Sequence, residues 1–164
     1  MYVSVTRDIR FERIRLFPDR RSMVKRANSL WASLMVVPVV FILAIGSVVL
    51  ESGGVGNAGT GFLNSLLIIL VIVSVTDLVI IVYIQTSQRF LAKRDVLYRT
   101  FQRLSVGSVL SEAITIYGCL LTLLSGSLIY IAGFSSASWI LLIWVRTRFS
   151  SNLKNIPDVG TNAV

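Results

Sequence analysis

The sequence contains no histidine and a single cysteine, Cys119. The missing histidine excludes an imidazole base, histidine-dependent catalytic triads and the common histidine-containing zinc sites. One cysteine excludes a disulfide within the chain, and its apolar surroundings offer nothing that would activate the thiol. The sequence also shows no nucleotide-binding motif and no set of metal ligands. We therefore expect a protein that is not an enzyme and that needs no cofactor and no metal.

Charged residues are scarce, at 15% of the 164 residues, whereas 54% of the residues are hydrophobic. The mean hydropathy is +0.77. This amount of apolar surface exceeds what one small water-soluble core can bury, so lipid must cover part of it. The composition therefore predicts an integral membrane protein.

The apolar residues fall in runs long enough to cross a hydrocarbon layer of about 30 Å, at ~1.5 Å per helical residue. The last run, residues 105–145, is too long for one helix, and Ser125-Gly126-Ser127 marks a tight turn within it. The runs predict an all-α bundle of four transmembrane helices, arranged as two helical hairpins, with spans at residues 30–50, 62–84, 105–124 and 128–145. Two alternatives stay open. The first run can be a cleaved signal peptide, and residues 133–136 can be a loop rather than part of a last helix.

The basic residues set the expected orientation. The chain has 16 Lys and Arg against 8 Asp and Glu, and all 16 lie in residues 1–29, in residues 85–104 or after residue 145. The positive-inside rule places these segments and both termini on the cytoplasmic or matrix side of a bacterial, archaeal or organellar inner membrane. Three spans would put the last basic segment on the opposite side, so we prefer four.

The segments outside the bilayer have simple expected roles. Residues 1–29 form a basic amino-terminal segment, residues 30–149 the transmembrane domain and residues 150–164 a disordered tail. In the loop of residues 85–104, apolar residues recur at helical spacing, which is typical of an amphipathic stretch on the headgroups or an extension of the neighbouring helices. We expect this loop to contact anionic lipid headgroups rather than nucleic acid, through Arg89, Lys93, Arg94, Arg99 and Arg103.

Two acidic residues, Asp77 and Glu112, fall inside the predicted spans, which contain no Lys or Arg to pair with them. An ionisable group in hydrocarbon is costly unless it is paired, neutral or hydrated, so each acid is a candidate site. Counting from the predicted helix ends puts both at a depth of roughly 10 Å, where they can face one another. Two carboxyls in contact do not both ionise cheaply, so the pair would hold a shared proton.

Hydroxyl groups accompany both acids at helical spacing. Ser74 precedes Asp77 by three residues, and Thr115 follows Glu112 by three residues. With Tyr117, these residues form a candidate ion- or proton-binding site. The alternative is that buried acids and hydroxyls only tie helices together, at about 1 kcal/mol each. Gly118 and Gly126 are candidate helix-packing residues, because small side chains permit close approach.

The string SEAITIYGCLLTLL resembles the carboxylate helix of rotary ATP synthase c subunits, in which Glu-Ala, a short apolar stretch and Ile-Tyr-Gly precede a Leu/Val/Ala-rich run. It also resembles a helix of small uncharacterised four-span bacterial membrane proteins. The resemblance implies that Glu112 binds a proton or cation. It does not imply a rotor subunit, because residues 62–84 lack the spaced glycines of the family's first helix. The matching residues are Glu112, Ala113, Ile116, Tyr117 and Gly118.

The sequence therefore predicts a small multi-span membrane protein that binds a proton or cation at Glu112, assisted by Asp77. We expect it to work as a homo-oligomer or as an accessory subunit of a membrane complex. One alternative is a structural or assembly subunit whose buried acids fix helix packing and whose basic loops bind lipid or a partner. A second alternative is a small ion or drug exporter that dimerises around the acid pair.

Overall fold

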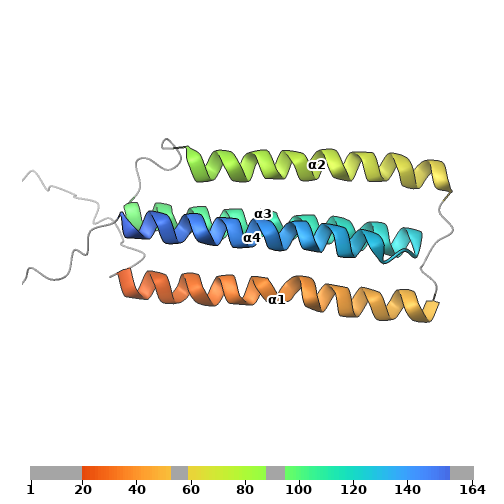
Figure 1. Ribbon diagram of the computed structural model, residues 1–164, viewed down its shortest axis with the longest axis horizontal. Coiled ribbons are helices and arrows are strands. Elements are labelled where there is room, and N and C mark those ends of the chain that lie inside the picture. The colour runs from red at the N-terminus through yellow and green to blue at the C-terminus, as the bar shows by residue number, and fades with distance from the viewer. Residues whose placement is uncertain (1–19, 53–58, 88–94, 156–164) are drawn as a thin grey trace, which may run out of the picture.

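The computed structural model describes residues 20–52, 59–87 and 95–155. Over these ranges the chain forms four helices, and all four are long and apolar enough to cross a membrane. The all-helical class and the four candidate spans predicted from the sequence are therefore confirmed. The helices are α1 (Arg20–Ser52), α2 (Thr60–Thr86), α3 (Val96–Ser125) and α4 (Ile129–Lys154) (Figure 1).

The helices extend beyond the apolar runs that predict them. Helix α1 begins ten residues before the predicted span, and α3 takes in residues 96–104 of the basic loop. Residues 150–154, expected in a disordered tail, instead continue α4, because Phe149 and Leu153 pack into an apolar cluster there. Residues 133–136 lie inside α4, which removes the loop alternative. Residues 1–19, 53–58, 88–94 and 156–164, which complete the predicted terminal segments and loops, lie outside the described residues.

Helix α3 is the centre of the arrangement. It packs against each of the other three helices, most extensively against α4, with which it forms a hairpin. Helix α2 packs on α3 and makes almost no contact with α1 or α4. Figure 1 shows α1 and α2 on opposite sides of the α3–α4 pair. Helices α2 and α4 therefore lie on either side of α3 without packing against each other, which leaves a gap in the bundle between them.

One end of the bundle carries every basic residue that the structure describes. The helices alternate in direction, so α1 and α3 start at this end and α2 and α4 finish there (Figure 1). We call it the basic end. Its basic residues are Arg20, Arg21, Lys25, Arg26, Arg99, Arg103, Arg146, Arg148 and Lys154.

The basic end also holds the apolar core. Six buried side chains from all four helices form one cluster there, and the N–H groups of Trp31 and Trp139 donate hydrogen bonds to backbone carbonyls across the α1–α4 interface. Close packing at this end fixes the helices relative to one another. The six side chains are Met23, Ala27, Ile81, Leu104, Val145 and Phe149.

The α3–α4 turn forms where the sequence predicts it. Gly126 ends α3 with φ of 72°, a left-handed conformation that glycine adopts without a steric penalty, and its N–H donates to the Thr122 carbonyl at 2.8 Å. The Thr122 hydroxyl oxygen accepts from the Ile131 amide at 2.9 Å, which satisfies a donor in the first turn of α4. Gly126, predicted as a packing residue, therefore makes the turn instead.

Gly118 lies directly against α4. A Cβ atom at this position would come within 2.7 Å of the Phe134 Cβ and 3.1 Å of the Tyr130 carbonyl oxygen. Neither atom can move without shifting the α4 backbone. Gly133 presents the opposite case, because a Cβ atom there would meet nothing within 4 Å.

These two glycines provide a matched test of the α3–α4 contact. Gly118→Ala should lower the free energy of unfolding by about 1–3 kcal/mol, because the new methyl group overpacks the interface. Gly133→Ala should leave stability unchanged or raise it by up to about 1 kcal/mol, since Ala is the better helix former. Unfolding in mixed micelles with rising SDS would measure both. Equal stability of the two variants would contradict this packing.

Candidate functional site

The buried face of α3 becomes polar beyond the apolar cluster. Four polar residues of α3 and two serines of α4 are buried in the middle of the α3–α4 pair, and we call this set the polar core. A polar patch inside a membrane bundle is unusual, because lipid offers no hydrogen bonds and every such group must find a partner within the protein. The polar core comprises Ser108, Ser111, Glu112, Thr115, Ser135 and Ser138.

Spacing places three of these residues on one face of α3. Ser108, Glu112 and Thr115 are separated by four and three residues, so their side chains lie above one another along the helix. Their positions run through about 10 Å of α3, at ~1.5 Å per residue. The carboxyl group therefore has a hydroxyl group on each side of it.

The serines of α4 lie beside the Thr115 end of this line and just beyond it. The buried residues of α4 recur every three or four positions, from Ile131 through Ser135 and Ser138 to Leu142. Thr122 meets Ile131 near the turn, and a Cβ atom at Gly107 would meet Val145 at 3.2 Å. Because the two helices are antiparallel, this register puts Ser138 level with Thr115.

Glu112 has no hydrogen-bond partner in the part of the chain that the structure describes. Its side chain is 7% exposed, and both of its carboxyl oxygens are buried without a partner. The hydroxyl oxygens of Ser108, Thr115, Ser135 and Ser138 are likewise unpartnered within the described residues. Each such group costs about 1–3 kcal/mol when it stays unsatisfied. A proton or a cation bound among these oxygens would relieve that cost.

Ser111 differs from the other hydroxyls of the polar core. Its Oγ donates to the Gly107 carbonyl of its own helix at 2.8 Å. This bond satisfies the donor and leaves lone pairs of the oxygen available as acceptors. Ser111 can therefore contribute an oxygen ligand but no proton.

Asp77 is held by a tyrosine of the neighbouring helix. The Tyr117 hydroxyl donates to Asp77 Oδ2 at 2.9 Å and joins α2 to α3. A hydrogen bond from a phenol to a carboxyl group supplies part of what water would supply outside the membrane. Of the predicted site residues, the structure brings these two together.

Asp77 and Glu112 do not face one another. Tyr117 follows Glu112 by five residues on α3, which is about 7.5 Å along the axis and roughly 140° around it. Asp77 lies on the side of α3 that Tyr117 occupies, whereas the helical spacing turns Glu112 away from that side.

The side-chain amide of Gln85 on α2 donates to the Arg103 carbonyl on α3 at 3.0 Å. Asp77 lies eight residues before Gln85, and residue 111 lies eight residues after Arg103, so on these antiparallel helices Asp77 is level with Glu112 to within about one residue. The similar depth predicted from the helix ends agrees with this register, and it is the direction of the two carboxyl groups that differs.

The hydroxyls predicted beside Asp77 are used within their own helix. Ser74 donates to the Leu70 carbonyl at 2.8 Å, and Thr76 donates to the Ile72 carbonyl at 2.9 Å. Bonds of this type are the usual way in which Ser and Thr satisfy themselves in a membrane helix. Ser74 therefore gives no proton to Asp77.

A further acceptor lies on α1, where sequence reasoning did not place one. Pro38 is fully buried inside α1 and has no amide hydrogen, so the Leu34 carbonyl lacks its usual helical donor. Trp31 bonds to the Leu142 carbonyl and Trp139 to the Met35 carbonyl, both at 3.3 Å. This register puts residues 34–38 of α1 level with residues 135–139 of α4, which is the level of the polar core.

Ser108, Ser135 and Ser138 were not among the predicted site residues. The sequence does show these serines as small polar residues spaced three or four positions from other polar residues. The same pattern is typical of close helix packing, so it does not identify a site. Only the fold shows that these hydroxyls share an interior with Glu112. The oxygen atoms of the polar core are hard ligands, suited to a proton or a small cation. Within the described residues, no group of three or more acidic, histidine or cysteine side chains could hold a metal ion.

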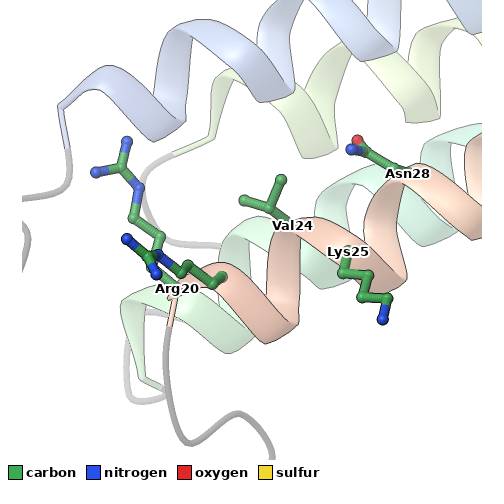
Figure 2. A pocket seen from close by; sticks show the side chains of 5 residues that line it. Arg20, Val24, Lys25 and Asn28 are labelled. Carbon is green, nitrogen blue, oxygen red and sulfur yellow. The ribbon is translucent and has the colours of Figure 1, made fainter.

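At the basic end, a basic pocket of about 460 Å³ opens beside α1. Figure 2 shows Arg20, Val24, Lys25 and Asn28 lining it, and Arg21 contributes as well. Arg20 donates to the Leu153 carbonyl at 3.0 Å, which ties the start of α1 to the end of α4.

The residues predicted to contact lipid headgroups are only partly described. Arg99 and Arg103 lie half-buried at the start of α3, and Arg103 donates to the Ser87 carbonyl at the end of α2. Arg89, Lys93 and Arg94 lie outside the described residues. Arg103 therefore holds the α2–α3 connection together in addition to any contact with lipid.

No protein-family model matches the chain, and searches of the curated proteins and of the solved structures likewise returned no match.

The bond between Asp77 and Tyr117 can be tested with a double-mutant cycle. Tyr117→Phe and Asp77→Ala should each destabilise the protein, and the two effects should couple by about 0.5–1.5 kcal/mol, as expected for a hydrogen bond between membrane helices. SDS-induced unfolding in mixed micelles would measure the coupling, with Tyr83→Phe on the exposed face of α2 as the control. If the two single effects on the free energy of unfolding simply add in the double variant, the hydrogen bond contributes nothing to stability.

Proposed function

We propose that this chain is a small multi-span membrane protein in which Glu112 binds a proton or a small monovalent cation within the bilayer. The observation that carries the proposal is the combination of a carboxyl group that is 7% exposed and four buried hydroxyl groups, all without partners in the described structure. A carboxyl group in such a place is stable when it holds a proton or a cation. The local resemblance of this helix to the c-subunit carboxylate helix supports the same role.

The polar core is closed at both ends by apolar side chains. Leu104 and Val145 are buried toward the basic end, and Leu121 and Ile131 are buried toward the turn. A bound ion would therefore be held within the bundle rather than passed along an open channel. This arrangement supports binding as the step that one copy performs. We propose that the chain works as a homo-oligomer or as an accessory subunit of a larger membrane complex.

In this proposal Asp77 has a separate role from Glu112. Its carboxyl group accepts the Tyr117 hydroxyl, and it lies on another side of α3 from Glu112. The alternative of an exporter that dimerises around the acid pair gains no support from a single copy, in which the two carboxyl groups point to different sides of α3. The alternative that retains support is a structural or assembly subunit, and the Asp77–Tyr117 bond is the observation that favours it.

Labelling with a hydrophobic carbodiimide can test the proton on Glu112. These reagents modify protonated carboxyl groups in apolar surroundings, so purified protein in lipid nanodiscs should be labelled at Glu112 at neutral pH. Labelling should fall about tenfold per pH unit once the carboxyl group ionises. Sodium chloride should slow the reaction relative to choline chloride if a cation binds, and should have no effect if only a proton binds.

Three variants serve as controls for the labelling. Glu112→Gln should abolish labelling while the protein still assembles and unfolds like the wild type. Tyr117→Phe should leave the labelling of Glu112 unchanged, because Tyr117 lies on another side of α3. Asp95→Asn removes an exposed carboxyl and should have no effect. An unreactive Glu112 across pH 5–9, with normal assembly of the Gln variant, would refute ion binding and favour the assembly role.

We also propose that the basic end faces the cytoplasm or the matrix, as the positive-inside rule requires. In a Cys119→Ser background, Gly59→Cys should react with a membrane-impermeant maleimide on intact cells, because it lies at the opposite end of the bundle. Ser151→Cys, at the basic end, should react only after the membrane is permeabilised. Both sites are exposed in the structure. The reverse pattern would invert the topology.

A further inference from the structure

An apolar groove of about 640 Å³ opens between α2 and α4, on the side of the bundle away from α1. Val75 and Leu78 of α2 form one wall, Ile114 of α3 lies at the bottom, and Tyr130 and Phe134 of α4 line the other wall. The groove exists because α2 rests on α3 alone. Its position within the candidate spans puts it in the hydrocarbon part of the bilayer.

Two small residues of α4 keep the groove open. Gly133 and Ala137 both line it, and a Cβ atom at Gly133 would meet nothing within 4 Å. The groove also lacks a free hydrogen-bond donor at its one serine, because Ser74 already donates to the Leu70 carbonyl at 2.8 Å. A ligand for this surface is therefore a hydrocarbon chain rather than a polar molecule.

The face of α4 that lines the groove continues to a basic residue at the basic end. Ala137 and Leu141 are followed at helical spacing by Trp144 and Arg148, so all four lie on one face. The Arg148 guanidinium lies 5.6 Å from the centroid of the Trp144 ring and is exposed at the basic end. Aromatic and basic residues together are typical of the level at which lipid headgroups lie.

The length of this face of α4 matches one leaflet. Ala137 and Arg148 are separated by eleven residues, or about 16 Å of helix, and one leaflet contributes roughly 15 Å of hydrocarbon. A phospholipid with its headgroup at Arg148 would therefore lay an acyl chain over Trp144 and Leu141 and into the groove at Ala137.

We propose that the α2–α4 groove binds one anionic phospholipid from the leaflet at the basic end. Its acyl chain occupies the groove, and its phosphate pairs with Arg148. Trp144 supports the guanidinium and covers the upper part of the chain. This lipid fills the open side of the bundle and connects α2 to α4, which otherwise make almost no contact.

Native mass spectrometry of the full chain in mild detergent can test this site. The probes are a phosphatidylglycerol and a phosphatidylcholine with identical acyl chains, added at equal concentration. The wild type should retain one phosphatidylglycerol in preference to phosphatidylcholine. Arg148→Gln should reduce this preference roughly fivefold, as expected for one basic contact at the membrane surface. Arg21→Gln, which removes an exposed charge from α1, should not change it.

A second pair of variants tests the groove itself. Gly133→Leu fills the groove and should lower retention of both lipids severalfold, while Gly46→Leu on α1, where a Cβ atom also meets nothing within 4 Å, should have no effect. Unfolding in SDS would show whether either variant disturbs the fold, and Gly133→Ile provides a second filling variant if the first does.

Two results would overturn the proposal. Equal retention of the two lipids by the wild type, or retention that Gly133→Leu leaves unchanged, would show that only the general lipid shell contacts this surface. A dimer that dissociates in Gly133→Leu and that cross-links through Ala137→Cys would show that a second copy of the chain occupies the groove instead.

Discussion

Hydrocarbon offers no hydrogen bonds, and this constraint determines how the four helices can be arranged. Helix α3 carries a line of serines and threonines together with Glu112, so it has to be covered, and it lies between the other three helices. Helix α2 is almost uniformly apolar and can leave most of its surface to lipid. It packs on α3 alone, where Asp77 accepts the hydroxyl of Tyr117. The order of packing therefore follows from which helix has polar groups to bury.

The interior is divided into an apolar part and a polar part. The apolar cluster lies at the basic end, where water and headgroups are near and apolar burial is a driving force. In the middle of the bundle that driving force is absent, since lipid chains are as apolar as leucine, and helices associate through small side chains and hydrogen bonds. Gly118 shows this directly, because it permits a backbone contact with α4 that any side chain would block. The same small residues bring the hydroxyls of α3 and α4 to one level.

Much of the fold follows from local features of the sequence. The spans follow from apolar length, and the α3–α4 turn follows from Gly126, whose positive φ suits glycine. Helix ends were harder, because residues 96–104 and 150–154 are amphipathic and become helical through packing at the basic end. The similar depth of Asp77 and Glu112 follows from the helix ends, but whether they face one another could not be predicted. That depends on how each helix is rotated about its axis, and a boundary error of one residue turns a side chain by ~100°. Both acids were recognisable from sequence, whereas Ser135 and Ser138 gain their meaning only from the helix that they face.

Asp77 and Glu112 have the same chemistry and nearly the same burial, but their surroundings separate their roles. Asp77 accepts a hydrogen bond from Tyr117, so it can stabilise the bundle as it stands. Glu112 shares the buried face of α3 with the Ser108 and Thr115 hydroxyls, which are themselves unpartnered within the described structure. It also lies within one turn of the level of Leu34 on α1, whose carbonyl Pro38 leaves without its usual donor. A group that served packing alone would gain stability from replacement by an apolar side chain of similar size. The unsatisfied oxygens on the buried faces of α3 and α4 do not by themselves stabilise the bundle, and this is the physical reason for proposing a ligand that they bind together.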